Sequence, residues 1–155
     1  MKRILIAASM LMLASSSIVS AADMVEPEVP EPPIEQKGIW GAIAYSEHDG
    51  EYGFFWGADK RDEAEEIAVK HCENADGKSC ELVLTFRNHR HWDDDDDSGF
   101  PYKHCGALAI AKDSDAPKTI WGSQSAETRK DAEELSLKQC EAKGQECKIK
   151  EWVCT

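Results

Sequence analysis

The sequence predicts an α+β fold: two tandem strand-strand-helix-strand units that form a mainly antiparallel sheet with helices packed on it, stapled by disulfides. Three observations predict it: an internal duplication, a change in each copy from strand-like alternation to a helical apolar stripe, and six cysteines among 155 residues. The hydrophobic share of 41% is sufficient for one modest folded domain.

The duplication begins at the first expected strand. Residues 40–44 (WGAIA) superpose on residues 105–109 (CGALA) with an offset of 65, and the same offset places the Trp-Gly pair at 56–57 over the pair at 121–122. Because several short matches occur in the same order, they indicate an internal repeat and not a chance resemblance.

Three extra residues then intervene in the second copy before the matches resume. Residues 62–66 (DEAEE) superpose on residues 130–134 (KDAEE), and cysteines follow at corresponding places in both copies. The domain at 38–155 therefore divides into repeats at 39–88 and 104–155, which an acidic loop at 89–103 joins.

Each copy opens with two expected strands. In residues 39–45 and 106–111 small residues, mostly alanine, alternate with larger apolar ones, which is typical of a strand whose alanine face lets another layer approach closely. A turn containing Gly50 leads to a second strand at 52–56, and the corresponding strand of the second copy is expected at 118–121.

A helix and a third strand follow in both copies. Asp59 is the expected cap of the first helix, and Thr128 with Asp131 resembles a capping box for the second. Gly77 and Gly144 end the helices. The first helix carries one stripe of residues at helical spacing: Ala64, Ile67, Ala68, His71 and Cys72. The expected third strands span 80–87 and 147–154.

Six cysteines allow fifteen pairings, and spacing alone does not choose among them. The duplication does choose, because a pair that recurs is most simply bonded within its own copy, and the two cysteines missing from the first copy then bond to each other. Trp40 and Arg87 stand at those two places in the first copy. The predicted bonds are Cys72–Cys80, Cys140–Cys147 and Cys105–Cys154. Zinc is the alternative, but these spacings and an oxidising compartment favour disulfides.

Residues 1–22 are expected to be a signal peptide. Lys2 and Arg3 precede a short apolar run at 4–13, and small residues follow. The run is about half the length of a membrane-spanning helix, so the mature chain is expected to lack a span and to be periplasmic or secreted. Residues 23–37 form a Pro/Glu-rich linker that favours extended conformations.

The charge balance restricts the class of partner. Eighteen basic residues against thirty acidic ones give a net charge of −12, which argues against nucleic acid, because the chain could not displace the counterions of a phosphate backbone. Much of this acidity lies in the linker and in residues 93–97. The overall acidity, together with the elimination of other function classes, favours a cationic protein partner.

Several of these patterns together resemble a known family. The run WGAIAYS, the later Trp-Gly, the Glu-Ala helix that ends in cysteine, the run CGALA and the terminal WVC resemble the secreted bacterial domain of unknown function 4189. The resemblance covers about residues 39–154, and the long Asp-rich connection departs from it. It implies a small exported domain, and it supplies no catalytic residue.

The acidic loop is the first candidate site. Its alternating oxygen-bearing side chains match the opening of a calcium loop, in which several oxygens converge on one ion: Asp94, Asp96 and Ser98. His89 and His91 are alternative ligands for a transition metal. The simpler interpretation is a solvated loop whose charges repel one another, and no cofactor other than calcium is indicated.

Aromatic residues are the second candidate site. Tyr52 and Phe54 share one strand face with Trp56, and Trp92 lies in the acidic loop. In this superposition the second copy has Pro117, Thr119 and Trp121 at the positions of the three strand residues. These rings either fill the core or bind a partner or glycan by stacking; Tyr52, Phe54 and Trp92 are the candidate partner-binding residues.

No pattern indicates an enzyme. The chain has neither G-x-S-x-G nor H-E-x-x-H, its cysteines are assigned to disulfides, and His71 suits a packing role. We therefore expect an envelope binding module, an inhibitor or immunity-type protein for a cationic partner. The alternatives are calcium or metal binding through Asp93–Asp97 and a small secreted hydrolase.

Overall fold

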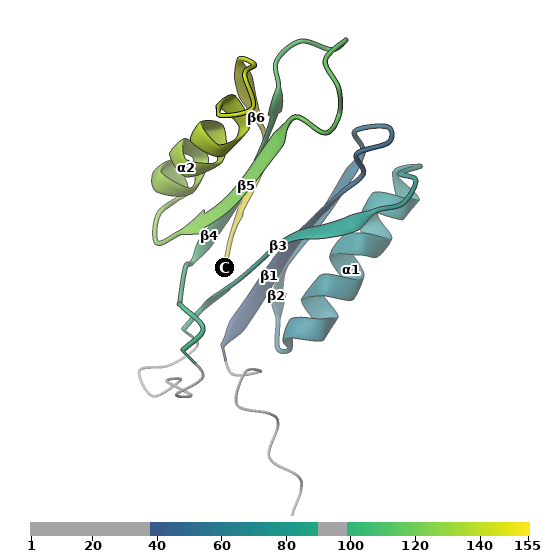
Figure 1. The fold of residues 1–155 in the computed structure, drawn as a ribbon. Coiled ribbons are helices and arrows are strands. Elements are labelled where there is room, and N and C mark those ends of the chain that lie inside the picture. The colour runs from purple at the N-terminus through teal and green to yellow at the C-terminus, as the bar shows by residue number, and fades with distance from the viewer. Residues whose placement is uncertain (1–37, 90–98) are drawn as a thin grey trace, which may run out of the picture. The chain divides into compact units, whose positions relative to one another are not determined.

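The computed structural model describes residues 38–89 and 99–155, and the expected fold class is confirmed (Figure 1). The first unit contains β1 (Ile39–Tyr45), β2 (Tyr52–Ala58), α1 (Arg61–Asn74) and β3 (Glu81–Asn88). The second contains β4 (Cys105–Ala111), β5 (Trp121–Ala126), α2 (Arg129–Glu141) and β6 (Cys147–Cys154).

Each unit closes a sheet of its own instead of contributing to a common one. The strand orders are β2-β1-β3 and β5-β4-β6, and all pairs within them are antiparallel. The sheets stack against each other, with α1 outside one and α2 outside the other (Figure 1).

The larger side chains of the central strands meet between the sheets. Ile43 and Tyr45 of β1, Phe86 of β3, Leu108 of β4 and Val153 of β6 form one buried cluster there. These positions are the alternating apolar positions of the sequence, and burial of such side chains contributes roughly 1.5–3 kcal/mol each. The inter-sheet core therefore joins the two units.

The small side chains of the same strands face the helices. In the first unit the buried helix positions are Ala64, Ala68 and Cys72, which pack with Trp40, Ala42 and Ala44. In the second unit the buried helix positions are Ala132, Ser136 and Cys140. Spacing of four residues places each set on one stripe, so each helix buries a narrow face.

One glycine in each second strand sets where the helix lies. A Cβ atom added to Gly53 would lie 2.2 Å from the carbonyl oxygen of Ala68 and 2.2 Å from the backbone nitrogen of Cys72. At Gly122 it would lie 2.5 Å from the carbonyl oxygen of Ser136. The helices consequently pack mainly over β2 and β1, and over β5 and β4, and less over β3 and β6.

The strand register corrects the superposition of the two Trp-Gly pairs, which is wrong. Ala44 pairs with Gly53, and its equivalent Ala109 pairs with Gly122, so these two glycines correspond. The extra residues of the second copy lie earlier than expected, in the longer hairpin turn before β5. The two Trp-Gly pairs lie at opposite ends of their strands, since Trp56 pairs with Gly41 near the start of β1 and Trp121 pairs with Ile110 near the end of β4.

Some element ends also differ from the expectations. The fifth strand begins at Trp121 instead of occupying 118–121, because the polar run after Trp121 forms the ladder with β4. The cap of α1 is Lys60, whose side chain makes no capping bond, and not Asp59. Thr128 does cap α2, since its hydroxyl accepts from the backbone N–H of Asp131 at 3.2 Å.

Candidate functional site

Three disulfides cross-link the chain, each within a single unit. They join Cys72 to Cys80, Cys140 to Cys147 and Cys105 to Cys154, the same pairs that the duplication predicts. The described residues contain no free cysteine, so none is left for nucleophilic chemistry or metal binding there. Disulfides persist where the surroundings are oxidising, which indicates such an environment for this chain.

The candidate aromatic residues of β2 contribute to the inter-sheet core. Tyr52 and Phe54 are partly buried and pack against the cluster around Phe86, and their rings stack at 6.4 Å. The Tyr52 hydroxyl donates to the Glu151 carboxylate at 3.3 Å. By the corrected register the second unit has Trp121, Ser123 and Ser125 at the places of Tyr52, Phe54 and Trp56. Trp56 alone of the three strand residues is largely exposed, at 58%.

The acidic-loop candidates Trp92, Asp94, Asp96 and Ser98 lie outside the described residues, so their roles in partner or calcium binding stay predictions. Within residues 38–89 and 99–155 no group of three or more His, Cys, Asp or Glu side chains is arranged to hold a metal ion. Neither α1 nor α2 has the length and apolarity of a membrane-spanning helix.

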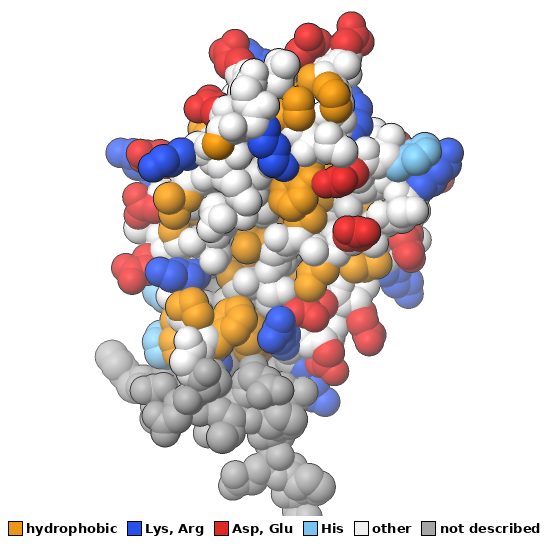
Figure 2. Space-filling model, viewed as in Figure 1, with side chains coloured by type: hydrophobic (Ala, Val, Ile, Leu, Met, Phe, Trp, Pro, Cys, Tyr) orange, Lys and Arg blue, Asp and Glu red, His pale blue; other side chains and the backbone are white. Residues whose placement is uncertain are grey.

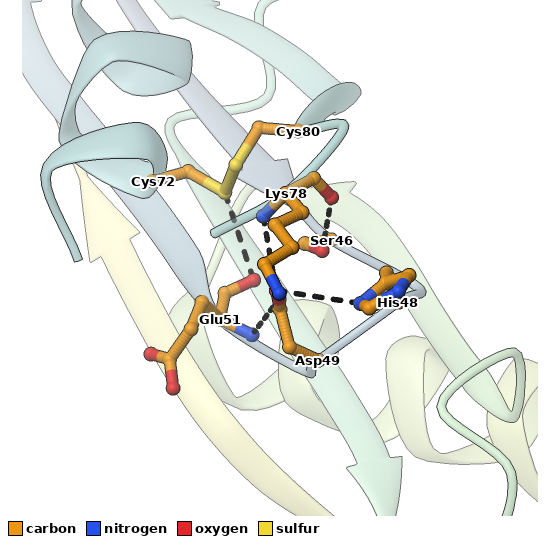
Figure 3. Close-up of polar contacts among 7 residues, drawn as sticks. All are labelled: Ser46, His48, Asp49, Glu51, Cys72, Lys78 and Cys80. Atoms are coloured by element: carbon orange, nitrogen blue, oxygen red, sulfur yellow. Dashed lines mark hydrogen bonds and ion pairs between the residues drawn. A yellow bond between two sulfur atoms is a disulfide. The ribbon is translucent and has the colours of Figure 1, made fainter. Parts of the chain in front are cut away.

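A polar network connects the β1–β2 turn to the residues that precede β3 (Figure 3). The carboxylate of Asp49 accepts from the backbone N–H of Lys78 at 3.0 Å and of Glu51 at 3.4 Å, and the Ser46 hydroxyl donates to the Lys78 carbonyl at 2.6 Å. The Ser46 hydroxyl and these N–H groups lower the pKa of Asp49. The network joins the turn to the loop that the Cys72–Cys80 bond closes, which is a structural role.

A cavity of about 210 Å³ lies between this turn and the β4–β5 turn. Three lysines and three carboxylates line it, so its charges balance: Lys118, Lys148, Lys150, Asp49, Glu51 and Asp113. Tyr45 also lines it, and burial, followed by the charges of Glu47, Asp49 and Glu51, raises the pKa of Tyr45 to about 12. Its phenol therefore stays protonated at neutral pH, where it donates to the Lys118 carbonyl at 3.1 Å.

His71 has a packing role. Its Nδ1 lies 2.8 Å from the carbonyl oxygen of Phe54, and its ring contacts that of Phe55. This contact connects α1 to β2, as the packing interpretation of the histidine expects.

A groove between α1 and β3 combines apolar and acidic side chains. It has a volume of about 500 Å³ and is lined by Glu65, Glu66, Val69, Lys70, Glu73 and Leu82. Glu66, Val69, Lys70 and Glu73 lie on one stripe of α1, because they are three or four residues apart. Leu82 of β3 stands opposite Ala44 on the helix side of the sheet and is 39% exposed.

The offset placement of α1 produces this groove. Since α1 lies over β2 and β1, it leaves the outer face of β3 partly uncovered where Leu82 lies. Glu65 is engaged by Arg61 at 2.7 Å and by the hydroxyl of Thr85 at 2.8 Å, whereas Glu66 and Glu73 are exposed. The groove thus has an apolar floor and an anionic rim.

The patterns in the sequence did not identify this groove. Helix carboxylates such as Glu65 and Glu66 read as ordinary solvated residues, and Leu82 reads as one member of a strand. Only the position of the helix over the sheet brings them together.

Comparison with known proteins identifies a family. Residues 40–91 and 98–154 match the family model described as "Domain of unknown function (DUF4189)". No curated protein matches the chain. The chain is similar to the NMR structure of Rv1813c from Mycobacterium tuberculosis, with 21% sequence identity, a TM-score of 0.46, and coverage of 100% of this chain and 98% of that chain.

Proposed function

The chain belongs to the DUF4189 family, whose description states no activity, and on this premise we propose that it is an exported binding module for a cationic protein segment. The segment docks in the α1–β3 groove. The protein acts without catalysis, as an inhibitor or immunity-type protein of the periplasm or the secreted fraction, following removal of residues 1–22 as a signal peptide.

The groove is the observation that supports this proposal. Leu82 and Val69 offer apolar contact area, and each aliphatic side chain that covers them gains roughly 25 cal/mol per Å² of apolar surface removed from water. Glu65 is paired with Arg61, but Glu66 and Glu73 still outnumber Lys70 at the rim. A segment with lysine or arginine beside aliphatic residues therefore complements both the charge and the apolar surface of the groove.

The acidity of the whole chain favours the same class of partner. After the removal of residues 1–22, which include Lys2 and Arg3, the net charge is −14, and it attracts a cationic protein over distances near the Debye length, which is about 8 Å at physiological salt. On the face drawn in Figure 2, hydrophobic side chains gather over the strands, and charged ones are frequent along both sides, over the helices. Because salt screens the attraction between opposite charges, association should be faster at low salt.

The test titrates the oxidised protein with a synthetic amphipathic helix that carries leucines on one face and lysines on the other. The methyl NMR signals of Leu82 and Val69 should shift, and added salt should weaken binding. Replacing Glu66→Lys and Glu73→Lys together should abolish these shifts, because the rim then repels the lysines.

The matched control carries the same change of charge away from the groove. Asp115→Lys with Glu127→Lys alters two exposed residues outside α1 and β3, so the Leu82 shifts should remain. Unperturbed Leu82 and Val69 signals at saturating peptide would overturn the proposal. Equal loss of binding in both double variants would also overturn it, since net charge and not the groove would then be responsible.

A further inference from the structure

We infer that the second unit carries an equivalent docking site between α2 and β6, so that one chain binds two cationic segments. The inference rests on the proposed function of the first groove and extends it to a surface on the other side of the molecule. The basis of this inference is the set of exposed residues that the two units have in common.

Each residue that lines the first groove has a counterpart of the same chemistry in the second unit. By the register of helices and strands, the set Glu65, Glu66, Val69, Lys70, Glu73 and Leu82 corresponds to Glu133, Glu134, Leu137, Lys138, Glu141 and Ile149. Ile149 pairs with Ala109 just as Leu82 pairs with Ala44, after the same shift of register in β6 and β3. The two sets therefore occupy the same places on their sheets.

Their surroundings repeat as well. Arg129 contacts Glu133 at 2.7 Å, as Arg61 contacts Glu65 at 2.7 Å. Since α2 packs less over β6 than over β5 and β4, the outer face of β6 is also incompletely covered. Trp152 stands where the first unit has Thr85 and is 37% exposed, which adds aromatic surface beside Ile149.

The fold alone does not explain this repetition. The positions that pack each helix on its sheet are the buried ones, whereas Glu66, Lys70 and Glu73 and their counterparts are exposed. Some exposed positions of the helices outside the two sets have diverged, since Asp62 corresponds to Lys130, His71 to Gln139 and Asn74 to Ala142, whereas Arg61 and Arg129 are shared. The exposed residues that the two units share thus include all the exposed helix residues of the grooves, and the shared arginines contact groove glutamates.

The placement of the helices makes the sites independent. α1 and α2 lie on opposite outer faces with both sheets between them, so a segment in one groove leaves the other open (Figure 1). A chain with two sites can bridge two partner molecules or bind one partner that carries two such segments with an increased effective concentration.

The experiment measures stoichiometry by calorimetry with the same amphipathic lysine–leucine peptide. The unmodified protein should bind two peptides, Glu66→Lys with Glu73→Lys should bind one, Glu134→Lys with Glu141→Lys should bind one, and the four changes together should bind none. The Asp115→Lys, Glu127→Lys control should still bind two. Circular dichroism of each variant verifies that it is folded.

The outcomes separate the inference from the proposed function. One peptide per chain, lost with the first pair of changes and unaffected by the second, would overturn the second site and leave the first intact. Absence of binding to the unmodified protein would overturn the proposed function itself. Two sites unaffected by either pair of changes would contradict both.

Discussion

The two units hold the start of their central strand by different chemistry at the same place. In the first unit Trp40 pairs with Arg87 across β1 and β3; in the second Cys105 pairs with Cys154 across β4 and β6. The second pair is a disulfide, whereas the Arg87 guanidinium lies 5.3 Å from the centre of the Trp40 ring. The same cross-strand position thus holds a cation–π contact in the first unit and a covalent bond in the second.

The difference shows how far each unit depends on the rest of the chain. The disulfide needs nothing beyond its own two strands. Arg87 is buried, donates to the Phe100 carbonyl at 2.7 Å and lies 4.1 Å from the centre of the Tyr102 ring, so it uses the connection between the units. Phe100 also packs edge-on against Trp40 at 5.1 Å. The first unit is therefore completed by residues outside its own repeat.

The largest expected effect concerns the covalent side of the comparison. Replacing Cys105→Ser and Cys154→Ser removes a bond that spans 49 residues, which should lower the free energy of unfolding by about 4 kcal/mol. The control pair Cys72→Ser and Cys80→Ser spans 8 residues and should cost about 2.5 kcal/mol. Urea unfolding of both variants measures this, and equal losses would contradict the loop-length argument.

The second-largest expected effect on stability concerns Phe100, in the connection between the two units. Phe100→Ala should lower the free energy of unfolding by about 2 kcal/mol, below the range for a fully buried ring because Phe100 is half-buried. Its contacts with Trp40 and Arg87 would be lost. Trp152→Ala, which removes an exposed ring beside Arg129, should cost about 0.5 kcal/mol. Thermal unfolding compares them; a larger loss for Trp152→Ala would reverse the comparison.

A third, smaller effect tests the geometry of the cation. Arg87→Lys keeps the charge but loses the planar group that contacts several rings, so the free energy of unfolding should fall by about 1 kcal/mol. Denaturant unfolding near neutral pH measures it. An unchanged midpoint would mean that only the charge of Arg87 matters.

The smallest effect is visible only at alkaline pH. Tyr45 stands where the second unit has Ile110, and its pKa is raised to about 12. Because the neutral phenol is favoured in the folded state, its contribution to stability is complete below the unfolded pKa near 10 and is lost as pH rises towards 12. Tyr45→Phe should reduce this loss.

The measurement is the urea midpoint at several alkaline pH values. Tyr52, whose pKa is also raised, retains part of the dependence in the Tyr45→Phe variant. Identical pH dependence of the two proteins would show that Tyr45 does not contribute.

Much of the fold could be predicted from local patterns. The alternation in residues 39–45 placed the first strand, and the repeated cysteines gave pairs that agree with the structure. The strand at Trp121–Ala126 was missed because its serines and glutamine carry no apolar alternation, and its ladder with β4 defines it. The Trp-Gly match failed for the related reason that register depends on pairing and not on identity.

The sequence by itself determined the duplication, the strand and helix types, the partner of each cysteine and the surplus of acidic charge. Periodicity and recurrence contain that information because they reflect backbone geometry and neighbours along one chain. Only the tertiary structure decided that the units form separate sheets, that Arg87 is covered by Phe100 and Tyr102, and that Leu82 is left exposed beside three glutamates. Exposure depends on where a helix lies over its sheet, and here a glycine distant in sequence allows that position.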